Sequence, residues 1–237
     1  MVCGASPLIL GHRGAPREAP ENTIASFQEA VRQGAHGVEL DVQRTEDGVP
    51  VVIHDDSLER TSSGTGRVNS WRWSDLKGVS VGGHPLPSFA QAVSWARSAG
   101  ALLNVEIKAT DVEEATLEIL AAADMLDRTI ISSFNSATVR RVAERAPDVR
   151  CYLLCEHWTE ETLDLVNASG AGGLCLGVDA ATADALDTLW NADLPTIVWT
   201  VDSAERIREL LRANIAGIIT NYPARAVRIA REMVEPE

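Results

Sequence analysis

The stretch GVELDV at residues 37–42 combines an apolar strand pattern with two acidic side chains. Successive side chains of a strand point to opposite faces, so Glu39 and Asp41 share one face and the apolar residues between them share the other. A carboxylate turned into the interior of a fold must be compensated, because an unpaired buried charge is costly. This stretch therefore predicts a buried strand that carries a polar site on one face.

Short apolar runs of the same kind recur along the whole chain, separated in most cases by amphipathic, helix-like stretches. The runs lie at residues 8–10, 37–42, 51–54, 102–107, 129–132, 150–154, 173–176, 196–201 and 217–219. Strands that alternate with helices in this way are typical of βα units and a parallel sheet. For a chain of 237 residues, the pattern predicts an α/β fold, a TIM-type (β/α)8 barrel that forms a single domain over residues 1–237.

Two regions depart from the βα rhythm. Between the runs 37–42 and 51–54 the chain is too short for a crossover helix, and Asp47-Gly48 is a hairpin signal. We therefore expect 51–54 to pair antiparallel with 37–42, which makes the barrel irregular near strands 2–3. Residues 55–87 are much longer than an ordinary βα loop and contain Trp71 and Trp73, so they are predicted to form a small cap insertion.

Composition restricts the classes of partner. The net charge of −13 argues against a nucleic-acid partner, which would need a basic face. No apolar run is long enough to span a membrane, and the N-terminus lacks a signal-peptide pattern. The cysteines show no metal-finger spacing and are interpreted as buried free thiols, with a Cys151–Cys155 redox pair as the alternative. We expect a cytoplasmic protein that acts on a small molecule without stable membrane association.

A second acidic stretch, NVEIK at residues 104–108, places Glu106 and Lys108 on one strand face. Together with Glu39 and Asp41, the sequence sets three acids against one lysine. A divalent cation would balance this charge, and all-oxygen ligation favours Mg²⁺, Ca²⁺ or Mn²⁺ over zinc. The alternative is that the acids form purely structural ion pairs with Lys108 and Arg13.

Two histidines directly follow apolar strand runs, at the face of a barrel where active sites lie. These are His12, in the GHRG stretch at residues 11–14, and His54. Antiparallel pairing around Asp47-Gly48 would bring His54 near the acids of residues 39–41. Two histidines near a reaction centre suit general acid and base roles close to neutral pH, whereas a lone histidine is more often structural. Nearby, Asn22 and Thr23 are candidates to cap the first helix, although Asn22 or Glu21 could instead approach a metal.

Further motifs follow in order along the chain. They are PENT at 20–23, ELDV at 39–42, VVIHD at 51–55, LERT at 58–61, NVEIK at 104–108, SSFN at 132–135, WTVD at 199–202 and ITNYP at 219–223. With GHRG at 11–14, this set closely resembles the glycerophosphodiester phosphodiesterase family. The family is related to the bacterial phosphoinositide phospholipases C and has an irregular TIM-type barrel.

The resemblance implies metal-dependent hydrolysis of glycerophosphodiesters to sn-glycerol 3-phosphate and an alcohol, with one Mg²⁺ or Ca²⁺ ion and Mn²⁺ as a third candidate. It also implies the roles of individual residues. These are metal ligation by Glu39, Asp41 and Glu106, acid–base catalysis by His12 and His54, phosphate binding by Arg13 and Lys108, and an apolar wall near the glycerol formed by Trp199.

Three alternatives remain at this point. A lysophospholipase D or phosphoinositide-type phosphodiesterase would use the same site on lipids, but the polar insertion at 55–87 favours water-soluble substrates. A barrel glycosidase could use Glu39 and Glu106 as its acid pair and would need no metal. A non-catalytic barrel could bind phosphorylated ligands only.

Overall fold

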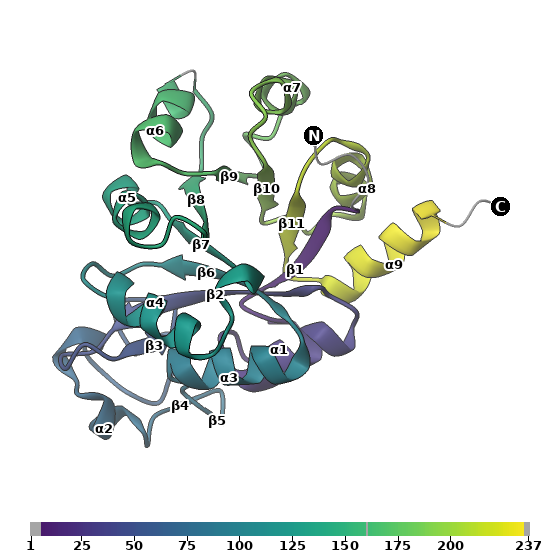
Figure 1. The fold of residues 1–237 in the computed structure, drawn as a ribbon. Helices are drawn as coiled ribbons and strands as arrows, with labels where there is room; N and C mark the ends of the chain where they lie inside the picture. Colours follow the sequence, from purple (N-terminus) through teal and green to yellow (C-terminus); the bar gives the residue numbers. More distant parts are fainter. Residues whose placement is uncertain (1–5, 160, 235–237) are drawn as a thin grey trace.

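The computed structural model describes residues 6–159 and 161–234. Eight parallel strands form a closed barrel, because the first of them pairs with both the second and the last (Figure 1). In order around the barrel, the strands are β1 (Leu8–His12), β2 (Gly37–Arg44), β6 (Leu102–Ile107), β7 (Thr129–Ser133), β8 (Arg150–Cys155), β9 (Gly173–Gly177), β10 (Thr196–Trp199) and β11 (Gly217–Thr220). The predicted TIM-type barrel is confirmed.

A ninth strand, β3 (Pro50–Val52), explains the irregularity. It pairs antiparallel with the end of β2, with Val42 opposite Val52. The connecting turn contains Gly48 with a φ of 81°, a conformation that glycine adopts easily. The predicted hairpin is therefore present, but β3 ends two residues before His54. Beyond it, the backbone N–H of Ile53 donates to the carbonyl of Asp41 at 3.1 Å and keeps the chain beside β2.

Helices surround the barrel on its outside (Figure 1). They are α1 (Ile24–Arg32), α3 (Phe89–Ala99), α4 (Glu113–Ala122), the 3₁₀ helix η2 (Leu126–Arg128), α5 (Ser136–Arg145), α6 (Glu161–Ser169), α7 (Ala183–Asn191), α8 (Ala204–Arg212) and α9 (Pro223–Val234). Thr23 rather than Asn22 caps α1, since its side chain accepts from the N–H of Ser26. Asn22 has a left-handed φ of 58° and turns its side chain toward the barrel instead.

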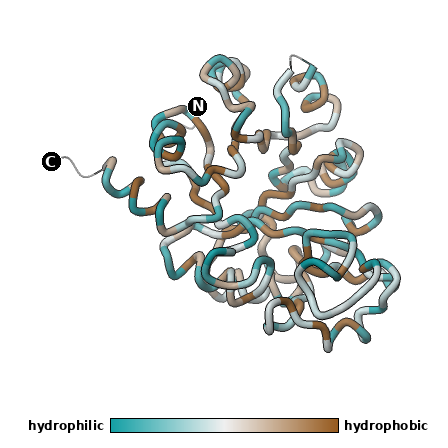
Figure 2. Tube along the Cα trace, turned by 180° about the vertical axis from the view of Figure 1, so that it is seen from behind, coloured by the Kyte–Doolittle hydropathy of each residue, from teal (hydrophilic) through white to brown (hydrophobic). Residues whose placement is uncertain are grey.

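Hydrophobic residues form one layer inside the barrel and another between the strands and the helices. Figure 2 shows hydrophobic colour along the central strands and alternating colours along the helices, as expected for amphipathic helices packed on a barrel. Phe27 of α1 is fully buried in the outer layer and packs on Trp95 of α3, with ring centroids 5.4 Å apart. The outer layer thus holds the early helices against β1 and β2, the strands that carry GHRG and ELDV.

The burial of Phe27 predicts a large stability effect. We expect Phe27→Ala to lower the free energy of unfolding by about 3–5 kcal/mol, as is usual when a buried aromatic ring leaves a cavity. Urea titration followed by circular dichroism measures this loss. Phe134→Ala is the matched control, because Phe134 is 49% exposed and its truncation should change stability by only about 0.5 kcal/mol. Equal losses in both variants would contradict the assigned packing.

Residues 55–87 fold into short elements beside β3. They are η1 (Val68–Ser70), α2 (Trp73–Leu76), β4 (Ser80–Val81) and β5 (His84–Pro85). A small apolar cluster holds them together, and Trp71 and Trp73 pack against it. The β4–β5 turn lies against the loop before α1, since a Cβ at Gly82 would stand 2.4 Å from Pro20 Cγ. The insertion is therefore fixed to the loop that follows the GHRG stretch.

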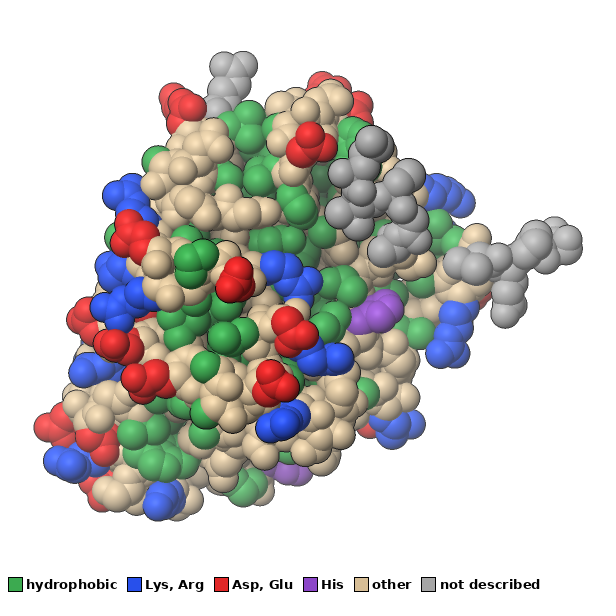
Figure 3. All heavy atoms as spheres, viewed as in Figure 1, with side chains coloured by type: hydrophobic (Ala, Val, Ile, Leu, Met, Phe, Trp, Pro, Cys, Tyr) green, Lys and Arg blue, Asp and Glu red, His purple; other side chains and the backbone are tan. Residues whose placement is uncertain are grey.

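The structure also bears on the surface charge, on the question of a membrane span and on the state of the cysteines. On the face shown in Figure 3, acidic and basic side chains are interspersed. Among the described residues, every helix is too short or too polar to cross a membrane. Cys151, Cys155 and Cys175 are free thiols in the described chain, and burial raises the pKa of Cys151 to about 11. Cys3 and the N-terminal residues 1–5 lie outside the described residues.

Candidate active site

The predicted site residues meet at the carboxyl ends of β1 and its neighbours. Sheet register places His12 of β1 opposite Glu39 of β2, and Asp41 of β2 opposite Glu106 of β6. Because these strands are adjacent and parallel, side chains at matching positions come together on the same face. Lys108 follows β6 directly and joins the group. The barrel architecture therefore gathers residues that are far apart in the sequence.

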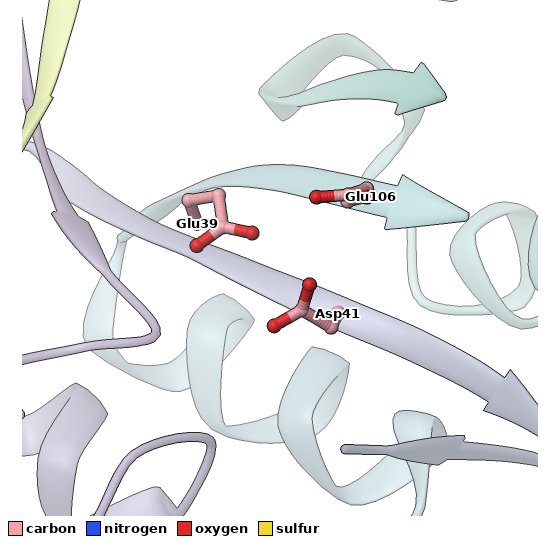
Figure 4. A group of neighbouring side chains, drawn as sticks. All are labelled: Glu39, Asp41 and Glu106. Carbon is pink, nitrogen blue, oxygen red and sulfur yellow. The ribbon is translucent and has the colours of Figure 1, made fainter. Parts of the chain in front are cut away.

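The three acids form a compact cluster. Figure 4 shows Glu39 and Asp41 on β2 and Glu106 beside them on β6. One carboxylate oxygen from each lies within 4.8 Å of the others, the geometry of a cation site. Burial raises the pKa of Glu39 well above its usual range, and the neighbouring charges of Asp41 and Glu106 raise it further. Burial and the charge of Asp41 likewise raise the pKa of Glu106. Without a cation, the cluster is therefore short of positive charge.

Two basic side chains contact the cluster. Lys108 Nζ lies 2.7 Å from Glu106 Oε1 and 3.6 Å from Asp41 Oδ1, and Arg13 Nε lies 3.3 Å from Asp41 Oδ2. The backbone N–H of Arg13 also donates to Glu39 Oε2 at 2.9 Å. These are the ion pairs of the structural alternative, and they offset only part of the charge. Within the described chain, Asp41 Oδ1 is buried and accepts no hydrogen bond, which leaves one oxygen open to a cation.

A network of charges links the cluster to the insertion. Arg13 donates to Glu21 at 2.8 Å, and Arg60 of the insertion donates to Glu21 at 2.9 Å and to Asp55 at 2.5 Å. Glu21 is thus held between two arginines. Asn22, the other residue considered for the metal, donates to Asp41 Oδ2 at 2.8 Å. Both residues contact groups of the site, and neither belongs to the acid cluster.

His12 lies with its Nδ1 atom 2.8 Å from Asn221 Oδ1, at the end of β11. Asn221 is in turn bound to Asp202, with Nδ2 donating to Oδ2 at 2.8 Å. Burial lowers the pKa of His12 and the charge of Arg13 lowers it further, and these effects outweigh the hydrogen bond to Asn221. His12 is therefore favoured as a neutral imidazole near neutral pH.

His54 has a different partner. Its Nδ1 atom lies 2.6 Å from Asp55 Oδ1, and Arg60 holds the same carboxylate. Hydrogen bonds from Arg60 keep the pKa of Asp55 well below its usual range, with a smaller contribution from His54. The two histidines thus have different partners, a carboxylate for His54 and an uncharged amide for His12.

An aromatic pair lines the mouth of the barrel. Trp199, at the end of β10, meets Phe134 edge-to-face, with ring centroids 5.6 Å apart. The indole N–H donates to the carbonyl of Cys175 at 3.1 Å, which fixes the ring. On the opposite side, a polar cavity of about 340 Å³ is lined by residues that include Gln43, Arg44 and Lys108. The site thus has one apolar and one polar side.

A larger, more apolar cavity of about 550 Å³ lies elsewhere. Ile9, His36 and Val227 are among its lining residues, which places it near the start of β1 and against α9. None of the predicted site residues lines it. Although this cavity is the larger of the two, it is therefore not assigned to the candidate active site.

Sequence reasoning missed several residues of this site. Asn221, Asp202, Asp55 and Arg60 hold the two histidines, and Phe134 extends the aromatic wall. A signal for one of them was present, since Asn221 directly follows a strand run just as His12 does. All five lie within the motifs that carry the family resemblance, Arg60 in LERT and the others at strand ends.

Comparison with known proteins identifies similar chains. Residues 12–225 match the model of the glycerophosphoryl diester phosphodiesterase family. A glycerophosphodiester phosphodiesterase of Caldanaerobacter subterraneus subsp. tengcongensis is 30% identical, over 95% of this chain and 98% of its own.

Solved structures share the fold. A glycerophosphodiester phosphodiesterase from Agrobacterium tumefaciens superposes with a TM-score of 0.81 at 26% identity, covering 94% of this chain and 99% of that one. An Oleispira antarctica phosphodiesterase in complex with its product sn-glycerol-3-phosphate has a TM-score of 0.86 at 23% identity, covering 95% and 97% of the two chains.

Proposed function

The chain belongs to the glycerophosphoryl diester phosphodiesterase family and is an enzyme of that activity, and we propose that it releases sn-glycerol 3-phosphate with the help of one divalent cation and two catalytic histidines, His12 and His54. The observation that carries the proposal is the cluster of Glu39, Asp41 and Glu106, with its unsatisfied oxygen on Asp41. The product is also the ligand named for the Oleispira relative.

The donor set fits a hard cation. Glu39, Asp41 and Glu106 offer oxygen ligands only, which suits Mg²⁺ or Ca²⁺, with Mn²⁺ as a third candidate. The carboxylate oxygens lie within 4.8 Å of one another, and the neighbouring charges add to the raised pKa of Glu39. A bound cation would offset this repulsion. When bound, the cation would supply positive charge beside the phosphate, the main requirement of phosphoryl transfer. The purely structural alternative leaves three carboxylates with only two basic partners in the described chain, Arg13 and Lys108.

Arg13 and Lys108 would complete a positive pocket in an acidic protein. Both side chains already lie at the edge of the cluster, 3.3 Å and 3.6 Å from Asp41 oxygens. Guanidinium and ammonium groups are the usual partners of phosphate oxygens. The pocket would hold the phosphate between the basic side chains, and Trp199 would contact the carbon atoms of the glycerol.

The histidines would move the protons. One would take a proton from the nucleophile, which is either water or a hydroxyl group of the substrate's own glycerol. The other would give a proton to the departing alkoxide. Each ring is fixed through Nδ1, so Nε2 is the atom of each ring that would face the substrate. Trapping and oxygen-exchange experiments distinguish the two nucleophiles. Attack by the glycerol hydroxyl forms a cyclic phosphate intermediate, and attack by water forms none.

The other interpretations are weaker. A glycosidase would use only two carboxyl groups and would leave Asp41, Arg13 and Lys108 at the same cluster without a role. A binding-only barrel does not fit an enzyme family. Activity on lysophospholipids is favoured only by the exposed Phe134 beside Trp199. The polar cavity next to Lys108 favours a water-soluble alcohol group.

The test is release of glycerol 3-phosphate from glycerophosphocholine and glycerophosphoglycerol by the purified protein. We expect release with added Mg²⁺, Ca²⁺ or Mn²⁺ and none in EDTA, with activity restored when the metal is returned. Undiminished release after chelation would overturn the metal assignment. Release from lysophosphatidylcholine alone would replace the substrate assignment with the lipid alternative.

A further inference from the structure

We propose that Asn221, held in place by Asp202, sets the tautomer of His12, so that His12 acts as the general base and His54 as the general acid. Asn221 is thus a positioning residue, since it acts through His12 and not on the substrate. The inference deepens the proposed function and rests on it, because both histidines must be catalytic.

The orientation of the Asn221 amide follows from its contacts with Asp202. The backbone N–H of Asn221 donates to Asp202 Oδ1 at 2.9 Å, and the side-chain Nδ2 donates to Asp202 Oδ2 at 2.8 Å. An ionised carboxylate only accepts hydrogen bonds. The NH₂ group of Asn221 must therefore face Asp202, and a flipped amide would set two acceptors against each other.

This orientation determines which nitrogen of His12 carries the proton. The remaining amide atom, Asn221 Oδ1, lies 2.8 Å from His12 Nδ1 and only accepts. Nδ1 must therefore be the donor, and a neutral imidazole has a single N–H. Nε2 is left with its lone pair, which is what a general base requires.

The pair is built into the barrel. Asn221 follows β11 and Asp202 follows β10, and these neighbouring segments stay joined because the N–H of Val201 donates to the carbonyl of Ile219 at 2.9 Å. Thr220 Oγ1 also donates to Asp202 Oδ1, at 3.2 Å. Asp202 thus accepts three hydrogen bonds from the β11 end, which leaves the Asn221 amide little freedom to rotate.

The second histidine has the complementary arrangement. His54 Nδ1 lies 2.6 Å from the Asp55 carboxylate, whereas His12 Nδ1 meets an uncharged amide. With the base assigned to His12 by its tautomer, the second proton-transfer role falls to His54, which would donate from Nε2 while Nδ1 stays bonded to the Asp55 carboxylate.

The competing interpretation is that Asp202 and Asn221 only join the ends of β10 and β11. Four variants separate the two: Asn221→Leu, Asn221→Asp, Asp202→Asn, and the exchanged pair Asp202→Asn with Asn221→Asp. Leucine keeps the size of the side chain and removes the acceptor. The exchanged pair again joins one amide to one carboxylate, in reversed positions, and keeps an acceptor toward His12 Nδ1.

The direct readout is ¹⁵N NMR of the histidine rings, with His12 identified by its absence from the His12→Gln spectrum. In the wild type we expect a proton on Nδ1 of His12. In Asn221→Leu we expect a shift toward the Nε2 tautomer, with kcat lowered roughly 10- to 100-fold and KM little changed. The exchanged pair should recover activity relative to either single substitution. The ring signals of His54 should not move.

Each outcome decides the matter. Retention of the Nδ1 proton in Asn221→Leu, or a lower Tm with unchanged kcat, would overturn the proposal in favour of the structural interpretation. The NMR measurement needs no substrate. If the wild type released no glycerol 3-phosphate with any metal, the proposed function would fail while the tautomer assignment could still be read.

Discussion

The Glu39→Gln variant should melt at a higher temperature than the wild type in EDTA while losing nearly all activity. Glutamine keeps an oxygen that can accept the 2.9 Å hydrogen bond from the Arg13 N–H and removes a buried negative charge. We expect Tm to rise by about 2–4 °C, which corresponds to about 1 kcal/mol for a chain of this size. With saturating metal, we expect glycerol 3-phosphate release to fall roughly 10³-fold, because a catalytic metal supplies several kcal/mol of charge stabilisation.

The sign of the stability change follows from the pKa of Glu39. Burial and the charges of Asp41 and Glu106 raise this pKa in the folded protein, so folding disfavours the ionised form. For a raised carboxyl pKa, the penalty is absent below the pKa of the unfolded chain, grows as the pH rises toward the folded pKa, and is complete above it. The Tm difference between variant and wild type should therefore be largest at neutral to alkaline pH and shrink on acidification.

Glu113→Gln is a matched control with the opposite expectation. Glu113 is also buried, but it pairs with Arg141, and backbone and arginine hydrogen bonds outweigh its burial and lower its pKa. Its charge stabilises the fold above the unfolded pKa, so the substitution should lower Tm at neutral pH. It lies outside the acid cluster and should leave catalysis intact. If both variants lost stability, the charge of Glu39 would not be the destabilising feature that its raised pKa implies.

The acid cluster could be predicted because it depends on pairs of residues that are close together in the sequence. Strand alternation alone places Glu39 and Asp41 on one face, and the same rule places Glu106 and Lys108 together. The register of β2 against β6 then needs only a parallel sheet to bring the two faces into contact. The hairpin could be predicted for the same reason, since Asp47-Gly48 is a turn signal within a segment too short for a helix.

The supports of the histidines could not be predicted in this way. His12 and Asn221 are 209 positions apart, and their contact depends on the closure of β1 onto β11 and on a single side-chain rotamer. An asparagine or aspartate at a strand end is also a common helix cap or turn residue, so its type does not reveal its partner. Asn22 illustrates this ambiguity, because the residue considered as a cap turned toward Asp41.

Substrates with different leaving groups should distinguish the catalytic roles of His12 and His54. An alkoxide needs a proton as the P–O bond breaks, whereas p-nitrophenolate is stable enough to leave without one. If His54 is the acid, His54→Gln should lower kcat by about 10²–10⁴-fold on glycerophosphoglycerol and far less on glycerophospho-p-nitrophenol. If His12 is the base, His12→Gln should lower kcat on both substrates to a similar extent, since both require activation of the nucleophile.

Parallel assays of the two variants on the two substrates measure these four losses, with thermal melts to show that each variant is folded. The reverse pattern, in which His12→Gln is rescued by the p-nitrophenyl substrate, would exchange the roles of the histidines. It would also contradict the inference drawn from Asn221, because a neutral His12 ring with its proton on Nδ1 has no proton on Nε2 to give. Equal losses in all four combinations would instead mean that neither ring protonates the leaving group, and that the charge at the Asp55 carboxylate serves only to anchor the insertion through Arg60.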